Sequence, residues 1–134
     1  MIDLFSGVVL VKMGPLVLVA TNKKYGGICL PGGKGELGES PLDAAYRELN
    51  EETGFSGSGL VPIATGPSCV EAARMVHMFL AETVCGDLKP ETGCDTYFTS
   101  WGCLLEESPF SPFYRQHFPR GIWHLRDTNW SYLR

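Results

Sequence analysis

The sequence predicts an α/β (α+β) fold, in which strands and one strong helix form a single domain over residues 1–134. Two β-branched apolar runs near the N-terminus, separated by Gly14 and Pro15, predict a pair of strands. The segment from Ser40 to Thr53 has apolar residues at helical spacing, between residues that favour helix ends. With 134 residues, 44% of them hydrophobic, the chain is large enough to bury one core.

The N-terminal region predicts adjacent strands. Ser6–Met13 and Leu16–Asn22 are rich in valine and leucine, and a tight turn fits between them. Because both runs are almost continuously apolar, we expect them in the middle of a covered sheet. Ile28–Leu30 predicts a short third strand, followed by a glycine-rich loop that starts at Pro31.

The helix has defined ends. Ser40 is the expected N-cap, Pro41 the first helical residue, and Asp43 completes a capping-box-like pair that stabilises by roughly 1 kcal/mol. Gly54 is the expected C-terminal stop. The apolar residues expected to form one buried stripe are Leu42, Ala45, Tyr46 and Leu49.

The second half of the chain carries weaker signals. In order, it predicts a weak strand at Gly57–Gly66, a turn at Gly66-Pro67, strands at Ala72–Thr83 and Thr96–Leu105, and a short helix at Ser111–Phe118. The aromatic tail Ile122–Arg134 is expected to pack on the domain. Exposed aromatic residues in that tail would equally permit a homodimer.

Composition excludes several function classes. A net charge of −4 argues against binding to nucleic acid, and it means that an anionic substrate needs added cations. The 5 cysteines contain no C-x-x-C pair, so we expect reduced, mostly buried thiols rather than a zinc site or disulfide framework. The N-terminus is a poor signal peptide, and the apolar runs are too short to span a bilayer. We therefore expect a cytoplasmic protein without a membrane partner.

Three glutamates on the predicted helix suggest a metal site. Glu48, Glu51 and Glu52 lie at positions i, i+3 and i+4, on one arc of the helix surface. Like charges at this spacing destabilise a helix, and near its C-terminus the helix dipole favours cations. A solvated surface face is the alternative, but it does not explain this clustering. Carboxylate oxygens on a rigid element suit Mg²⁺, or else Mn²⁺.

The loop before the helix adds a possible anion site. Four glycines, with Lys34 among them, allow backbone N–H groups to approach a phosphate closely. The glycines are Gly32, Gly33, Gly35 and Gly38. The spacing does not match a P-loop, and an ordinary turn is the alternative.

Loop and helix together resemble the Nudix box, G-x5-E-x7-R-E-U-x-E-E-x-G-U, where U is a bulky apolar residue. Every fixed position is matched, by Gly33, Glu39, Arg47, Glu48, Leu49, Glu51, Glu52, Gly54 and Phe55. The upstream strands, the L-P-G-G sequence before the box and Trp101 in a late strand also resemble small Nudix hydrolases.

The resemblance implies an α/β/α sandwich around a mixed sheet, and Mg²⁺-dependent hydrolysis of a nucleoside diphosphate linked to another group. Glu51 and Glu52 would be the principal metal ligands, and Glu48 a ligand or the base that deprotonates water. Arg47 would orient a glutamate and pair with Glu39, which secures the loop. Gly33, or its carbonyl, would reach the metal shell. No protein nucleophile is required.

Substrate contacts are less well marked. Cationic candidates for phosphate contacts are Lys34, Lys23 and Arg74, with Lys24 as a further one; Tyr25 and Tyr97, with Phe98 and Phe110, could stack a base. Glu91 or Asp95, and less strongly Glu106 or Glu107, could supply a further acid near the metal. Solvent exposure of the charged residues and burial of the aromatic ones are the alternatives.

Substrate signatures of the family are mostly absent. The stretch typical of NADH-cleaving members does not occur, and Val70 and Ala72 stand where ADP-ribose and diadenosine polyphosphate hydrolases have proline and tyrosine. We expect a (d)NTP or oxidised dNTP pyrophosphohydrolase of the MutT type, from the small size and lack of an N-terminal extension. The alternative is ADP-ribose or another nucleotide sugar or dinucleotide. A non-catalytic nucleotide-binding module ranks lower, because no box glutamate has been lost.

Overall fold

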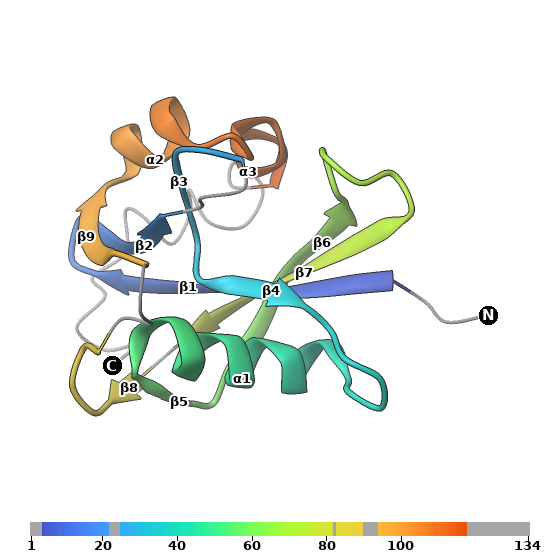
Figure 1. Ribbon diagram of the computed structural model, residues 1–134. Helices are drawn as coiled ribbons and strands as arrows, with labels where there is room; N and C mark the ends of the chain where they lie inside the picture. The colour runs from blue at the N-terminus through green and yellow to red at the C-terminus, as the bar shows by residue number, and fades with distance from the viewer. Residues whose placement is uncertain (1–3, 22–24, 82, 90–93, 118–134) are drawn as a thin grey trace.

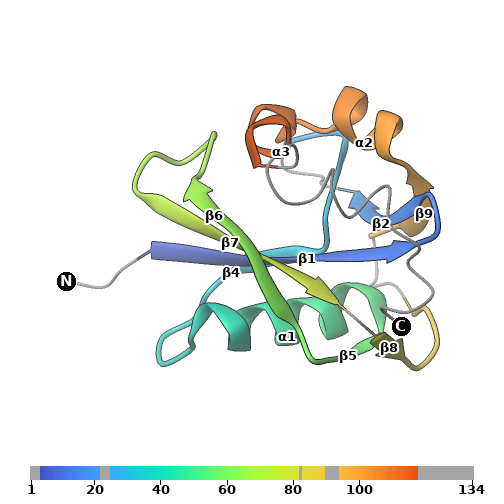
Figure 2. The same ribbon diagram turned by 180° about the vertical axis from the view of Figure 1, so that it is seen from behind.

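Helices cover both faces of a mixed β-sheet in the computed structural model, which describes residues 4–21, 25–81, 83–89 and 94–117. Helix α1 (Pro41–Thr53) lies on one face, and α2 (Trp101–Glu107) and α3 (Ser111–His117) lie on the other (Figure 1). The view from behind shows the same layers, with β6 and β7 in front (Figure 2). The expected α/β/α sandwich is confirmed.

The main sheet contains seven strands. The strands in chain order are β1 (Leu4–Met13), β2 (Leu16–Thr21), β3 (Ile28–Cys29), β4 (Gly32–Lys34), β5 (Ser56–Ser58), β6 (Val61–Pro67), β7 (Arg74–Ala81), β8 (Thr83–Cys85) and β9 (Thr96–Ser100). The sheet order is β3-β2-β1-β7-β6, with β4 paired to β1 and β9 paired to β2. β1 and β7 run parallel, and β5 and β8 form a separate antiparallel pair.

Strand β1 is the centre of this arrangement. One edge of β1 pairs with β7, while its other edge pairs with β4 near the N-terminal end and with β2 near the C-terminal end. The expectation that the first two strands are covered on both faces is confirmed, since Val9, Leu10 and Leu18 have no exposed surface. The side chains of alternate residues in these two strands therefore pack into two separate hydrophobic cores, one on each face of the sheet.

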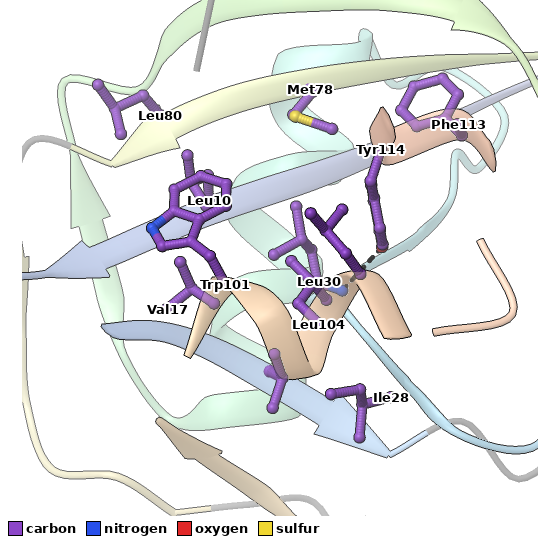
Figure 3. Close-up of a cluster of buried hydrophobic side chains, with 12 residues drawn as sticks. Leu10, Val17, Ile28, Leu30, Met78, Leu80, Trp101, Leu104, Phe113 and Tyr114 are labelled. Atoms are coloured by element: carbon purple, nitrogen blue, oxygen red, sulfur yellow. Dashed lines mark hydrogen bonds between the residues drawn. The ribbon is translucent and has the colours of Figure 1, made fainter. Parts of the chain in front are cut away.

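The two cores lie on opposite faces of the sheet. On the α1 face, Val9 and Leu18 pack with Ala45 and Leu49 of the helix. On the other face, the core combines strand residues with residues of α2 and α3 (Figure 3). The residues labelled there are Leu10, Val17, Ile28, Leu30, Met78, Leu80, Trp101, Leu104, Phe113 and Tyr114.

Helix α1 begins and ends as predicted, but its buried face differs. The Ser40 hydroxyl accepts a hydrogen bond from Asp43 N at 3.1 Å, the Asp43 carboxylate accepts one from Ser40 N, and Gly54 has a φ of 82°. Leu42 is 38% exposed, whereas Ala44, absent from the expected stripe, is fully buried. The backbone of α1 lies so close to Gly7 of β1 that small side chains face the sheet at this point.

Three secondary-structure predictions were wrong. Gly66-Pro67 is not a turn, because both residues pair with β7 within β6, an edge strand that tolerates proline. Gly32–Lys34 is a strand rather than a loop, because it pairs with β1. The strand predicted at Thr96–Leu105 ends at Ser100, whose hydroxyl accepts from Cys103 N at 3.2 Å and caps α2.

Other expectations had mixed outcomes. The short helix at Ser111–Phe118 is confirmed by α3. Thiols are less buried than expected, since Cys69 and Cys85 are exposed. The tail Ile122–Arg134 lies outside the described residues. In the described part of the chain, no helix combines the length and the apolar character needed to cross a bilayer.

The close approach of α1 to β1 predicts a strong effect of Gly7→Ala. An added Cβ would lie 2.7 Å from Pro41 O and 2.8 Å from Ala45 N, both backbone atoms that cannot rotate away. We expect the free energy of unfolding, measured in urea, to fall by about 3 kcal/mol.

The matched control is Gly102→Ala on an exposed position of α2, where a Cβ would meet only Ser100 Oγ at 3.9 Å. This change should be neutral or stabilise by about 0.5–1 kcal/mol. Equal stability of the two variants would contradict the close helix–strand contact.

Candidate active site

The three glutamates of α1 lie beside one edge of β4. Gly35 N donates to Phe5 O, and Val9 N donates to Pro31 O. In the segment from Pro31 to Gly35, the backbone N–H and C=O groups of every second residue therefore point toward β1. In an antiparallel pair, the residues between them have their backbone groups on the opposite edge of the strand. The backbone N–H and C=O groups of Gly32 and Lys34 therefore point away from β1. At that edge Gly32 N donates to Glu52 Oε2 at 3.1 Å.

This geometry bears on Gly33, which the resemblance placed near the metal shell. Gly33 contacts the Glu48 carboxylate, since an added Cβ would lie 2.5 Å from Cδ of Glu48. The Gly33 carbonyl, however, is on the side of β4 that pairs with Gly7. The backbone carbonyl facing the glutamates is that of Gly32, which the sequence interpretation placed only in the anion loop.

Arg47 connects the loop to the glutamates. Its Nε and Nη2 donate to the two carboxylate oxygens of Glu39 at 2.8 and 2.9 Å, so the expected pair is present. Nη1 donates to Glu48 Oε1 at 2.9 Å and to Glu51 Oε2 at 3.1 Å. Nη2 also donates to Lys34 O at 3.0 Å, which ties the helix to the edge of β4.

These contacts shift both partners toward their charged forms. The hydrogen bonds from Arg47 hold the pKa of Glu39 below its usual value, helped by the Glu36 backbone N–H. The hydrogen bond to Glu39, followed by that to Glu48, raises the pKa of Arg47. The pair is therefore ionised at neutral pH.

Negative charge exceeds positive charge around Arg47. Its guanidinium lies within 3.7 Å of carboxylates from Glu36, Glu39, Glu48 and Glu51. No basic residue stands in the last turn of α1 to compensate. An oxygen-rich, electron-rich set of this kind suits a hard divalent cation.

Glu48, Glu51 and Glu52 lie on the same face of α1, but their carboxylates do not converge on one point where a metal ion could bind. Among the described residues, no three His, Cys, Asp or Glu side chains form a group ready to hold an ion. The reason is local, because Glu48 and Glu51 both bind Arg47 Nη1, and Glu52 binds Gly32 N. A metal ion would have to replace some of these donors.

A cavity of about 210 Å³ lies on the other face of β4. Its floor is the sheet, where Lys34, Ser6 and Val76 stand side by side on β4, β1 and β7. Gly32 and Val8 form the next row. The cavity therefore touches the same short strand that the glutamates contact from the α1 side.

The cavity has an aromatic end and a charged end. Phe110, Phe113 and Tyr114 line it from the α3 side, and Tyr25 packs edge-on against Phe110 with ring centroids 5.5 Å apart. Leu30 N donates to the Tyr114 hydroxyl at 2.9 Å (Figure 3), and burial raises the pKa of this tyrosine. Lys34, Glu71 and Arg74 form the charged end.

The structure brings some predicted substrate residues together and separates others. Lys34, Tyr25 and Arg74 all line the cavity, although Arg74 is only 8% exposed and binds Glu71. Tyr97 pairs with Val19 in β9 and is not among the cavity residues. Lys23, Lys24 and Glu91 lie outside the described residues.

The other acids considered for the metal shell do not join the three glutamates. Asp95 lies beside β2, where its backbone bonds to Thr21. Glu106 and Glu107 are on α2, across the sheet from α1 (Figure 1). Sequence reasoning missed Glu71, whose only signal was its place three residues before Arg74.

The comparisons with known proteins agree with this geometry. The sequence matches the family model of the NUDIX domain over residues 4–121. Over 56 residues it is 45% identical to an ADP-ribose pyrophosphatase of Bacillus subtilis (strain 168), a match covering 40% of this chain and 29% of that protein. The matched part of the chain thus corresponds to less than a third of that relative's length.

Solved structures are similar over most of the chain. The solution structure of the E. coli ORF135 protein has a TM-score of 0.74, 20% identity and 94% of each chain covered. A structure from work on MutT of Aliivibrio salmonicida and Vibrio cholerae has a TM-score of 0.68 and 20% identity, covering 88% of this chain and 97% of that one. At this identity the similarity establishes the fold alone.

The Arg47 network predicts that Arg47→Lys is not a conservative change. A lysine ammonium cannot span Glu39, Glu48 and Lys34 O together, because it lacks the planar fork of donors. We expect a loss of about 1–2 kcal/mol in the free energy of unfolding, measured in urea with EDTA present.

Glu51→Gln serves as the comparison at the same cluster. It removes one charge from a group with excess carboxylates, so stability in EDTA should change by less than about 0.5 kcal/mol, toward stabilisation. If Arg47→Lys proved as stable as Glu51→Gln, the bridging role of Arg47 would be refuted.

Proposed function

The chain belongs to the Nudix family, whose members are pyrophosphohydrolases, and we propose that it hydrolyses the pyrophosphate linkage of a nucleoside diphosphate derivative with the help of Mg²⁺. One observation carries the proposal. The acidic cluster of α1 and the cavity lie on opposite faces of β4, so a bound molecule can extend from one to the other around its edge.

The two regions match the two chemical parts of a nucleotide. The aromatic end of the cavity suits a base, since Phe110 and Tyr25 present flat apolar surface there. A diphosphate would lie at the edge of β4, where the Gly32 backbone meets Glu52 on one side and Lys34 lines the cavity on the other. The charge of the diphosphate cannot be met by Lys34 alone beside so many carboxylates, which is the reason for a divalent cation.

The residues present fit such a cation. Glu48, Glu51 and Glu52 would hold it, with the Gly32 carbonyl as a further oxygen donor. A metal ion bound there supplies charge neutralisation for the diphosphate and lowers the pKa of a bound water. Mn²⁺ has similar ligand preferences and should substitute for Mg²⁺.

The protein groups around the glutamates have positioning roles. Arg47 holds Glu48 and Glu51 at one nitrogen, which keeps both carboxylates on the β4 side of the helix. Glu39 fixes the guanidinium from the other side. Glu48 is half-buried against Gly33, and is our candidate for a ligand or for the base that takes a proton from water.

The second group attached to the diphosphate, opposite the nucleoside, has two candidates. A further phosphate would make the substrate a nucleoside triphosphate, as expected from the sequence. A second ribose would make it ADP-ribose, and the identity with an ADP-ribose pyrophosphatase over 56 residues supports this alternative. Retention of all the box glutamates argues against a purely nucleotide-binding module.

A substrate panel tests the activity directly. Purified protein would be incubated with Mg²⁺ and nucleoside triphosphates, dNTPs, 8-oxo-dGTP, ADP-ribose, dinucleoside polyphosphates and NADH, with separated products measured by chromatography. Cleavage within a pyrophosphate linkage, abolished by EDTA, is the expected result. A folded protein that binds Mg²⁺ and leaves the whole panel intact would support the binding module instead.

Glu52→Gln should separate activity from stability. The glutamine amide oxygen can still accept from Gly32 N, so the fold keeps this contact and the melting temperature should stay within about 2 °C of the parent. Loss of a charged metal ligand should lower kcat by about a hundredfold or more.

Asp87→Asn, an exposed carboxylate in the loop after β8, is the control for charge alone and should retain full activity. Undiminished turnover by Glu52→Gln would show that the metal assignment is wrong.

A further inference from the structure

We propose that Glu71 recognises the ribose hydroxyls of the substrate, so that the protein prefers ribonucleotides to 2′-deoxyribonucleotides. The inference rests on the proposed function and narrows its substrate class to ribonucleotides, where the sequence prediction covered both a (d)NTP and an oxidised dNTP. Glu71 stands in the turn between β6 and β7, and it is the one carboxylate among the described residues that line the cavity.

The turn that carries Glu71 is held in one conformation by its own hydrogen bonds. Ser68 Oγ accepts from the backbone N–H groups of Val70 and Glu71, both at 3.2 Å. Ser68 N donates to Arg74 O at 2.8 Å, and Arg74 N donates to Glu71 O at 2.9 Å. A turn closed in this way can present a side chain to a ligand without a large ordering cost.

Arg74 then fixes the direction of the carboxylate. Its Nε donates to Glu71 Oε2 at 2.7 Å and its Nη2 to Glu71 Oε1 at 3.3 Å, while Nη1 donates to Phe5 O at 2.8 Å. The guanidinium is thus anchored on β1 and fixes the orientation of the Glu71 carboxylate. Arg74, which the sequence suggested as a phosphate contact, acts here as a positioning residue.

The Glu71 carboxylate is accessible from the cavity. The Glu71 side chain is 36% exposed, and the contact from Arg74 Nη2 to Oε1 is long. Each carboxylate oxygen can accept more than one hydrogen bond, so the contacts with Arg74 do not prevent a ligand from donating to the same carboxylate. The groups on a nucleotide that donate without carrying charge are the ribose hydroxyls and the amino or imino groups of the base.

Position favours the ribose over the base. Glu71 Oε2 lies 3.9 Å from Lys34 Nζ, at the charged end of the cavity beside β4. The aromatic residues that suit the base come from the α3 segment and from Tyr25. In a nucleotide the ribose is bonded directly to the phosphates, so a carboxylate beside Lys34, which is proposed to meet the diphosphate, is placed to reach the ribose hydroxyls. Two neighbouring hydroxyls can donate to the two oxygens of one carboxylate.

The test compares substrates that differ by one oxygen. For each nucleotide that the panel shows to be hydrolysed, kcat/KM is measured for the ribose form and its 2′-deoxy form with the same base. Because a site built to accept a hydroxyl rejects the analogue that lacks it, we expect a preference of about tenfold for the ribose form. Equal values, or a preference for the deoxy form, would overturn the proposal.

Binding provides a readout that does not depend on turnover. Calorimetric titration with Ca²⁺ in place of Mg²⁺, which supplies the divalent charge that the diphosphate needs, should show about tenfold tighter binding of ADP than of 2′-deoxy-ADP. Absence of turnover on the whole panel would count against the proposed function, and this titration would still decide whether the cavity distinguishes the two sugars. Equal affinities would refute the role of Glu71.

Two variants assign the preference to this residue. Glu71→Ala should bring the ribose and deoxy forms to equal kcat/KM by weakening only the ribose form. Glu71→Gln keeps a partner for Arg74, so it should fold even if the alanine variant does not, and should reduce the preference to about threefold or less. The exposed Asp87→Asn should keep the full preference. An unchanged preference in Glu71→Gln would place the recognition elsewhere.

Discussion

The missing side chains of two glycines allow α1 to lie against the sheet where the glutamates are needed. A Cβ on Gly7 would enter the backbone of α1, and a Cβ on Gly33 would enter the Glu48 carboxylate. The helix can therefore sit close to β1 and β4, with Ala45 and Leu49 sealing the contact. The hydrogen bonds of the candidate site depend on this short distance between α1 and β4, because Arg47 and Glu52 bond directly to backbone atoms of β4.

The short strand β4 divides the site between two faces of the sheet. Gly33 faces the glutamates, while Lys34 and Gly32 face the cavity, and the alternation of a strand is sufficient to produce this division. In the proposed function the strand lies between the nucleoside and the ion. Its second edge carries the Gly32 and Lys34 backbone groups, and under the proposed function the diphosphate would meet these fixed dipoles there.

Local signals in the sequence predicted the helix and the first strand pair well. Ser40, Asp43 and Gly54 act within a few residues of each other, and their cap geometry follows from chemistry that the sequence displays directly. Gly32–Lys34 has no strand-like composition, and its conformation depends on pairing with β1. Trp101–Leu105 has strand-like composition, but the Ser100 cap turns it into a helix.

The candidate site also combines features that the local sequence predicts with features that depend on tertiary contacts. The spacing of Glu48, Glu51 and Glu52 predicted one acidic face because a helix has a fixed period. Which backbone carbonyl faces the glutamates, that of Gly32 or that of Gly33, depends on the register of β4, which no local pattern contains. Glu71 required the fold of a turn and the anchoring of Arg74 on Phe5, more than sixty residues away in the chain.

The central claim is that a divalent cation binds between the last turns of α1 and the edge of β4, and paramagnetic broadening by Mn²⁺ tests it most directly. In a ¹⁵N-labelled sample titrated with Mn²⁺, the amide signals of Gly32, Gly33 and Glu52 should disappear first. Signals from the exposed face of α2, on the other side of the sheet, should persist at the same concentration. Loss of signals elsewhere in the molecule first, or no selective loss at all, would contradict the account.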